Sequence, residues 1–251
     1  MSSGEMTLEQ RRLLGVALVP LLSALLSVSI VNVVLPSVQS TIGATNSALQ
    51  WVLAGYTLAF GVVLVPAGRA GDVYGRGRLF IAGLVLFGAG SLVAGLAPNT
   101  LVLNLARVGM GLGSGLLNPQ TVGLIQQFFA GKQRGVAFGL FGATVGVSVA
   151  IGPVLGGVLI ALLGPEWGWR SSFLVNVPIV VFAIILAFLW FPQGAWRALK
   201  SGVPDIDPVG TGIFTLAILF VMLPFLQHES GLAYLLLPVG LIMFTAWAFW
   251  A

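Results

Sequence analysis

Long apolar runs, separated by short polar segments, dominate this sequence. A run of about 18 or more apolar residues is long enough to cross a lipid bilayer as a helix. Eight runs of this kind can be placed, at roughly residues 13–36, 50–67, 79–97, 101–123, 136–163, 172–191, 209–226 and 232–251. The pattern therefore predicts an all-α membrane protein with eight transmembrane helices.

Composition supports a membrane protein and narrows its chemistry. The chain is 58% hydrophobic and 7% charged, with a mean hydropathy of +1.05, which is unlike a soluble domain. It has no cysteine, which excludes disulfides and thiolate metal sites. The net charge of +4 is small and lies between the apolar runs, so it indicates topology rather than a nucleic-acid partner. The first apolar run is too long for a signal peptide and ends without a cleavage site, so we expect it to be retained.

The basic residues predict the orientation in the membrane. If the N-terminus is cytoplasmic, the outer loops hold only Arg170, and Arg107 lies within a span. The inner segments then hold Arg11, Arg12, Arg69, Arg76, Arg78, Lys132, Arg134, Arg197 and Lys200. Because cytoplasmic loops are enriched in Lys and Arg, we expect a multi-pass protein of the plasma (inner) membrane with its N-terminus inside.

The segment Gly68–Arg78, G-R-A-G-D-V-Y-G-R-G-R, is glycine-rich and dense in charge. Such a segment is expected to be a loop at the membrane surface, where glycine permits a tight turn. It resembles the signature loop between helices 2 and 3 of the major facilitator superfamily, roughly G-x-L-A-D-x-x-G-R-[KR]. The matching positions are Gly68, Asp72, Gly75 and Arg76, whereas Ala70 and Gly77 depart from the pattern. The resemblance implies that Asp72 and Arg76 latch an inner gate; the alternative is an ordinary basic turn.

Polar residues within the spans are candidates for a substrate pocket, because such groups tend to face other helices or a cavity. The run L-S-V-S-I-V-N-V-V-L-P is similar to a segment of the 14-span drug:proton antiporter group of that superfamily, with Ser27 at the group's acidic position. We expect a bend at Pro20 and a helix stop at Pro36. The pocket candidates are Ser27, Asn32, Tyr56 and Asn118. A helix-packing role is the alternative for Ser27.

Arg107 is the one charged residue deep within a predicted span. Placing a cation there costs about 2.5–3.5 kcal/mol on insertion scales, so function is the default explanation. The surrounding residues resemble the superfamily's span-4 motif, L-x-x-x-R-x-x-Q-G-x-G, with Met110 in place of the glutamine. The resemblance implies a role in proton coupling. An arginine capped by backbone carbonyls is the alternative.

The fifth predicted span is rich in glycine, which lets helix backbones approach closely. Its segment from Ser148 resembles the superfamily's antiporter motif, G-x-x-x-G-P-x-x-G-G, with serine at the first position. The matching positions are Gly152, Pro153, Gly156 and Gly157. The resemblance implies a close-packed hinge that faces a second half of the transporter; a purely structural glycine face is the alternative.

An acid-x-x-x-Arg pattern occurs twice, as Asp72 with Arg76 and as Glu166 with Arg170, offset by 94 residues. The same offset superposes the first predicted span on the fourth and the second on the fifth. With one pair predicted inside and the other outside, the pattern indicates an inverted three-plus-three repeat. We therefore expect a major-facilitator-type six-helix bundle at 1–192, a cytoplasmic linker at 193–208 and an additional pair of transmembrane helices at 209–251.

Taken together, the motifs resemble the N-terminal half, plus the extra helix pair, of a drug:proton antiporter. The resemblance implies a small organic substrate, protons, the lipid bilayer and a missing C-terminal half as partners, with no cofactor. A truncated non-transporting membrane protein and an uncoupled facilitator or importer remain open. No nucleophile–base pair, metal cluster or phosphate loop points to an enzyme, and the single histidine, His228, falls in a predicted turn.

Overall fold

The computed structural model describes residues 6–199, 208–226 and 235–250, and all of its regular elements are helices. They are α1 (Leu8–Ser29), α2 (Val31–Ile42), α3 (Asn46–Tyr74), α4 (Arg76–Gly95), α5 (Thr100–Phe128), α6 (Gly131–Leu174), α7 (Asn176–Trp190), α8 (Gln193–Trp196), α9 (Pro208–Leu226) and α10 (Leu236–Trp250). The predicted all-α fold is confirmed.

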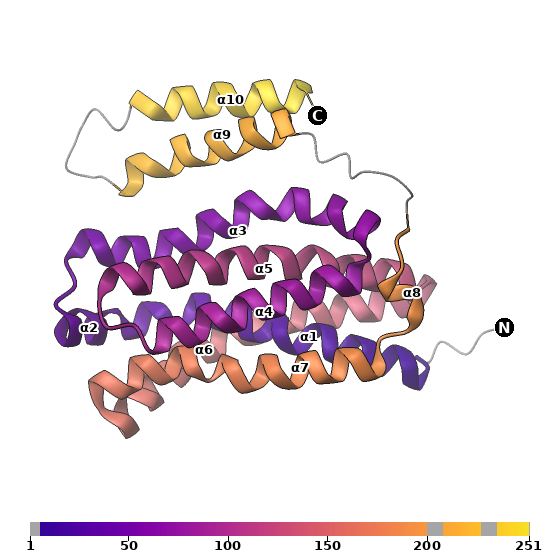
Figure 1. Cartoon of the computed structure of the whole chain (residues 1–251), viewed down its shortest axis with the longest axis horizontal. Helices are drawn as coiled ribbons and strands as arrows, with labels where there is room; N and C mark the ends of the chain where they lie inside the picture. The colour runs from indigo at the N-terminus through magenta and orange to yellow at the C-terminus, as the bar shows by residue number, and fades with distance from the viewer. Residues whose placement is uncertain (1–5, 200–207, 227–234, 251) are drawn as a thin grey trace.

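The long helices run side by side along the length of the molecule, and α9 and α10 form a separate pair beside α3 (Figure 1). Among the described residues, five helical stretches are long and apolar enough to cross a membrane. They are Leu8–Ser29, Asn46–Tyr74, Arg76–Gly95, Thr100–Phe128 and Gly131–Trp190. The last stretch turns back within itself, and the shorter apolar helices in α9 and α10 lie where the seventh and eighth spans were predicted.

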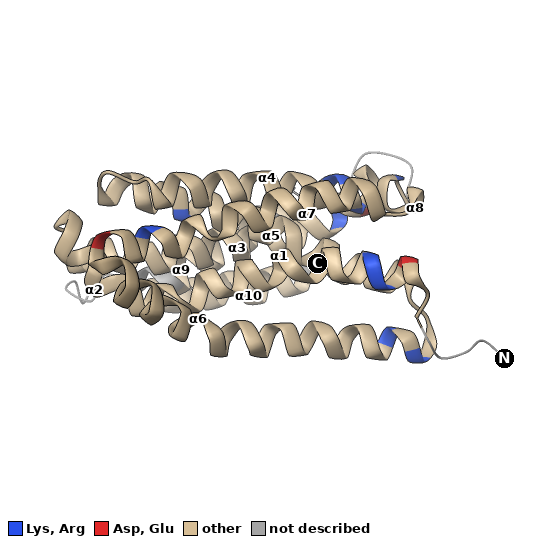
Figure 2. Cartoon of the chain, turned by 90° about the horizontal axis from the view of Figure 1, so that it is seen from below, with Lys and Arg blue, Asp and Glu red and all other residues tan. Residues whose placement is uncertain are grey.

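Basic side chains gather at the end of the molecule where the described N-terminal helix begins (Figure 2). The helix order explains this arrangement, because α1 begins, α3 ends, α4 begins and α6 begins at that end (Figure 1). The sequence prediction that the basic segments share one side of the bundle is therefore consistent with the chain's path.

Glycines bring α4 and α5 into backbone contact. A Cβ added to Gly113 would lie 2.5 Å from the backbone nitrogen of Phe87 and 2.8 Å from the carbonyl oxygen of Gly83. Likewise, a Cβ on Gly90 would lie 2.9 Å from the backbone nitrogen of Met110. Small residues at such crossings allow the close packing that holds membrane helices together, so these positions fix the relative placement of the two helices.

The expected loop at Gly68–Arg78 is wrong in its extent. Helix α3 continues to Tyr74, α4 begins at Arg76, and the turn is made by Gly75 alone, at φ 97°. The chain stays helical up to this point because the Gly75 amide still donates to the Gly71 carbonyl at 3.0 Å. A single residue with positive φ, which glycine adopts without strain, is then enough to reverse the chain.

One other boundary differs from the prediction. Pro36 does not stop the first span; the backbone stays helical at Ile30, between α1 and α2, and α2 continues through Pro36 to Ile42, where Gly43 at φ 64° ends it. Glycine in the left-handed conformation is a common helix stop. Pro36 removes only one backbone hydrogen bond, and α2 continues past it until Gly43. By contrast, the fifth span ends at Gly164, at φ 78° and immediately before Pro165, which agrees with the predicted range 136–163.

The described start of the predicted linker packs against the turn between α3 and α4. The Leu199 amide donates to the Asp72 carbonyl at 2.7 Å, and the Trp196 carbonyl oxygen lies 2.6 Å from where a Cβ on Gly75 would be. The Trp196 ring stacks on Phe188 at 5.3 Å between centroids. Lys200, Asp205 and Asp207 of the linker, and His228 beyond it, fall outside the described residues.

Candidate functional site

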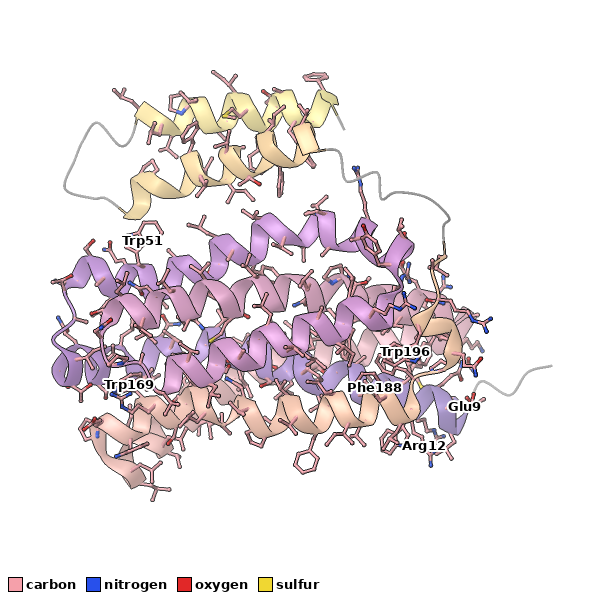
Figure 3. The ribbon with its side chains drawn as sticks, in the orientation of Figure 1. Glu9, Arg12, Trp51, Trp169, Phe188 and Trp196 are labelled. Carbon is pink, nitrogen blue, oxygen red and sulfur yellow. The ribbon has the colours of Figure 1, made fainter. Side chains whose placement is uncertain are left out.

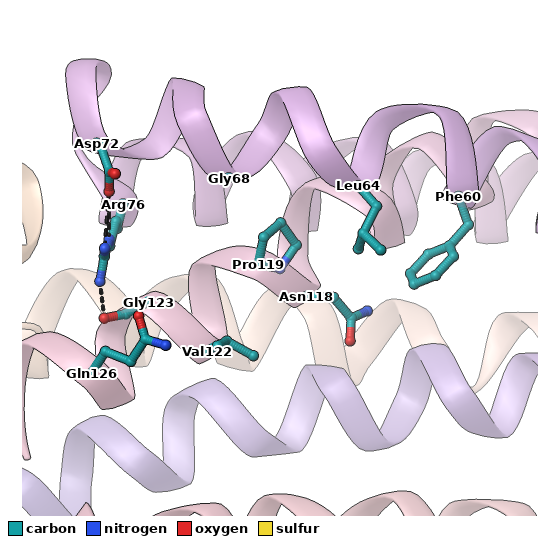
Figure 4. Close-up of a pocket in the computed structure, with 10 residues that line it drawn as sticks. All are labelled: Phe60, Leu64, Gly68, Asp72, Arg76, Asn118, Pro119, Val122, Gly123 and Gln126. Atoms are coloured by element: carbon teal, nitrogen blue, oxygen red, sulfur yellow. Dashed lines mark hydrogen bonds and ion pairs between the residues drawn. The ribbon is translucent and has the colours of Figure 1, made fainter. Parts of the chain in front are cut away.

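The signature residues form a clamp that joins three helices (Figure 4). Arg76, at the start of α4, donates from Nη2 and Nε to Oδ1 of Asp72 on α3, at 2.9 and 3.2 Å. Its Nη1 donates to the backbone carbonyl of Gly123 on α5. The side chains of Arg76 and Asp72 are 14% and 28% exposed, so water screens the pair only partly. The clamp therefore fixes the basic end of α3, α4 and α5 relative to one another.

Gly123 was not among the predicted site residues, yet the clamp depends on its lack of a side chain. A Cβ there would lie 2.6 Å from Cζ and Nε of Arg76. Gln120, one turn earlier, is buried and donates from Nε2 to the Ala67 carbonyl at 2.8 Å, across from Gly71. A polar amide deep in an apolar span was the available sequence signal for Gln120; Gly123 had no such signal among so many glycines.

A groove of about 510 Å³ opens between α3 and α5 beside the clamp (Figure 4). Four apolar side chains line one part of it, and the polar part holds both clamp side chains and two amides. The lining residues are Phe60, Leu64, Gly68, Asp72, Arg76, Asn118, Pro119, Val122, Gly123 and Gln126. The groove therefore brings together the predicted Gly68, Asp72, Arg76 and Asn118. A mixed lining of this kind suits an amphipathic compound, since most ligand sites combine apolar walls with a few polar groups.

Arg107 lies inside the bundle, 1% exposed, and its partners there are neutral. Its Nε donates to the Val52 carbonyl at 2.9 Å and its Nη1 to the Ser27 carbonyl at 3.2 Å. The guanidinium carbon lies 4.3 Å from the centroid of the Tyr56 ring, a cation–π arrangement. Carbonyl capping, the alternative left open by the sequence, is what the structure shows around this side chain.

Three of the predicted pocket residues lie outside the groove. Tyr56 is buried, and its hydroxyl donates to the Ala24 carbonyl at 3.0 Å. Ser27 is also buried, and its hydroxyl accepts a hydrogen bond from Nδ2 of Asn176 at 2.9 Å. Asn32 is exposed on α2. Of the four candidates, only Asn118 lines the groove between α3 and α5.

Asn176, at the start of α7, is a polar residue that the sequence analysis did not select. It is 2% exposed and ties three helices together through serine hydroxyls. Its Oδ1 accepts from Ser23 at 2.5 Å, and its Nδ2 donates to Ser27 and, at 3.2 Å, to Ser91. Since a buried amide without partners is costly, these serines explain how Asn176 is accommodated.

The residues of the antiporter motif on α6 face two different directions. A Cβ on Gly156 would lie 2.9 Å from Cγ1 of Ile30, and one on Gly152 would collide with Oγ of Ser29. These two glycines therefore face the junction of α1 and α2 within the same bundle, which corrects the expectation that they face a second half. Gly157 has open space where a Cβ would be, and Pro153 is exposed, so only these two remain available to an outside partner.

The second acid–arginine pair repeats the geometry of the first at the opposite end of the bundle. Arg170 Nε lies 3.6 Å from Oε1 of Glu166. Its Nη1 donates to the carbonyls of Gly95 and Ala97, at 3.2 and 3.0 Å, at the end of α4. Each arginine thus joins a nearby carboxylate to backbone carbonyls of another helix, as an inverted repeat predicts.

Long apolar helices, close glycine crossings and an acid–arginine pair at each end describe a bundle of membrane helices with the arrangement that an inverted repeat predicts. The sequence matches the Major Facilitator Superfamily over residues 18–251, so the chain belongs to this superfamily. The recognised family and fold are confirmed.

Relatives and solved structures agree with this assignment. The chain is 40% identical to a probable actinorhodin transporter of Streptomyces coelicolor, over 87% of this chain and 37% of that protein. It is 35% identical to the puromycin resistance protein pur8 of Streptomyces alboniger, over 94% of this chain and 46% of that protein. A crystal structure of peptide transporter POT in complex with sulfate superposes with a TM-score of 0.65 at 13% identity, covering 88% of this chain and 47% of that one. The chain thus spans less than half the length of these proteins.

Proposed function

We propose that this chain forms one bundle, with an additional helix pair, of a plasma-membrane exporter that exchanges small organic compounds for protons by alternating access. The observation that carries the proposal is the groove beside the Asp72–Arg76 clamp, which combines apolar walls with a carboxylate, a guanidinium and amides. The superfamily membership and the names of the two Streptomyces relatives support an organic cargo.

In this proposal the N-terminus is cytoplasmic, so the clamp lies at the inner end of the bundle. Residues 1–192 form the six-helix bundle, 193–208 the cytoplasmic linker and 209–251 the additional pair. A second bundle completes the transport path, because major facilitator pockets lie between two bundles and this chain spans less than half the length of its relatives. Gly157 and Pro153 are then free to contact the second bundle.

Arg107 serves proton coupling indirectly in this scheme. A guanidinium does not give up its proton in proteins, so the exchanging proton requires a carboxylate. The acidic residues of the chain are Glu5, Glu9, Asp72, Glu166, Asp205, Asp207 and Glu229, and all of them fall outside the interiors of the predicted spans. We therefore assign the proton-carrying group to the second bundle, with Arg107 as a fixed positive charge that biases its protonation.

The test is transport by the whole protein in proteoliposomes with an imposed pH gradient. We expect a cationic amphipathic dye to move against the proton flux and to stop when an ionophore collapses the gradient. Transport that ignores the gradient would support an uncoupled facilitator, and no transport of any tested cargo would support a non-transporting role.

A matched pair of variants links the activity to the clamp. Asp72→Asn keeps an oxygen acceptor for Arg76 but removes the negative charge. We expect its transport rate to be five- to ten-fold lower while membrane insertion stays normal. A loss of about 1 kcal/mol of interaction free energy corresponds to roughly five-fold. Glu9→Gln removes an exposed carboxylate at the same end and should leave the rate unchanged. Equal rates for Asp72→Asn and the unaltered protein would remove the clamp from the mechanism.

A further inference from the structure

A second groove, of about 390 Å³, lies between α1 and α7, away from the clamp. Its lining residues are Gly15, Val16, Val19, Ile179, Phe182, Ala183, Leu186 and Trp190. The buried Val16 and Ala183 form its floor, and the exposed Val19 and Phe182 form its rim. The groove exists partly because Gly15 has no side chain, since a Cβ there would meet nothing within 4 Å.

The groove is apolar along its length and positively charged at one end. Arg12 lies one helical turn before Gly15, on the same face of α1, and its guanidinium carbon is 5.3 Å from the centroid of the Trp190 ring. Figure 3 places Arg12 near the beginning of α1, beside the end of α7. Glu9 is one turn further toward the N-terminus, but Arg12 forms no ion pair with the carboxylates that the structure describes. The Arg12 guanidinium is exposed and retains donors for an anion.

The dimensions of the groove match one leaflet of a bilayer. Ile179 and Trp190 are eleven residues apart on α7, which at about 1.5 Å per residue is roughly 16 Å. Half of a hydrocarbon core of about 30 Å is about 15 Å. An acyl chain lying in the groove would therefore reach from the surface at Arg12 to near the middle of the membrane.

We propose that this groove binds an anionic glycerophospholipid, with one acyl chain between α1 and α7 and the headgroup phosphate on Arg12. Arginine suits this role, because its planar fork binds phosphate through two parallel hydrogen bonds. Basic pockets between membrane helices on the cytoplasmic side are suited to anionic headgroups. The site is separate from the groove beside the clamp and does not depend on what the protein transports.

A comparable groove without a charge provides the control. It lies between α4 and α5, has a volume of about 350 Å³, and is lined by Leu86, Ala89, Gly90, Val93, Val102, Leu105, Ala106 and Gly109. None of these residues is charged, and Gly109, like Gly15, has open space where a Cβ would be. Filling this groove should therefore leave the preference for an anionic headgroup unchanged.

The experiment counts lipids retained by the purified protein in mass spectra of the intact complex. The protein is equilibrated in mixed micelles with equal amounts of phosphatidylglycerol and phosphatidylcholine. We expect a preferred phosphatidylglycerol adduct. Arg12→Gln should lower that preference about five-fold, which corresponds to about 1 kcal/mol for one basic residue near an anionic headgroup. Gly15→Leu should remove the adduct by filling the groove.

Two variants separate this site from general effects. Arg197→Gln removes another exposed arginine and should keep the preference, and Gly109→Leu should keep the phosphatidylglycerol adduct. The proposal is overturned if Arg197→Gln lowers the preference as much as Arg12→Gln. Equal retention of the two lipids by the unaltered protein would overturn it as well. Arg12→Gln alters an exposed side chain, so its result does not depend on whether Gly15→Leu folds.

Discussion

Replacing Gly123 by alanine is the most direct test of the clamp. The added Cβ would lie 2.6 Å from the Arg76 guanidinium, so this flexible side chain has to shift, and we expect it to lose its hydrogen bond to the Gly123 carbonyl. A hydrogen bond to a charged group contributes about 1.5–3 kcal/mol. Alanine gains about 0.8–1 kcal/mol over glycine in a helix interior, so we expect a net destabilisation of about 0.5–2 kcal/mol.

Gly109→Ala on the same helix isolates the helix-propensity gain. Its Cβ would meet nothing within 4 Å, so this variant should be slightly stabilised. The free energies of unfolding of the two variants should therefore differ by about 1.5–3 kcal/mol. Unfolding in mixed micelles of a mild detergent and SDS, followed by circular dichroism, measures this difference.

A double-mutant cycle then assigns the effect to Arg76. In an Arg76→Ala background the guanidinium is absent, so Gly123→Ala should lose its penalty and match Gly109→Ala. The coupling between positions 76 and 123 should be about 1.5–3 kcal/mol, which is within the range for residues in contact. A penalty that persists without Arg76 would show that Gly123 packs against something else and would refute the clamp.

Two further predictions concern topology and the glycine helix. The chain has no cysteine, so single cysteines can be introduced at the exposed Ser47 and Lys132. An impermeant maleimide should label the cysteine at position 47 from outside and the cysteine at position 132 only after permeabilisation. The reverse result would invert the orientation. Gly156→Ala should destabilise the bundle, because its Cβ would lie 2.9 Å from Ile30, whereas Gly157→Ala, with open space, should be slightly stabilised, as Gly109→Ala is. Equal effects of the two alanines would contradict the assigned faces of α6.

The sequence was sufficient to predict the class of fold, because burial in lipid imposes long apolar helices whatever their partners. Gly68, Asp72 and Arg76, which the sequence analysis selected together from one motif, all line one groove, while their role as a gate stays a prediction. Turn lengths were less predictable. The charge of Gly68–Arg78 indicated a loop, yet the backbone remained helical to Tyr74 because helix α3 can extend past the apolar run and satisfy its own hydrogen bonds.

Side-chain partners were the part that the sequence could not supply. Ser27 and Tyr56 are polar at membrane depth, and a cavity or a neighbouring helix would explain either of them. The choice depends on how the helices rotate against one another. That rotation places Ser27 against Asn176, which is 149 residues away, and places the Tyr56 hydroxyl on the Ala24 carbonyl. No local pattern contains this information.

Gly156 and Gly157 show the same limit within a single motif. Adjacent residues on an α-helix point about 100° apart, so two neighbouring glycines cannot serve the same contact. Ile30 fills the space beside Gly156, while the space beside Gly157 is open. A motif defined by residue identity therefore combines an internal packing position with an external one. The contact that a substitution disturbs is decided by the register of α6 against α1 and α2, and this is why the two alanine variants are expected to behave differently.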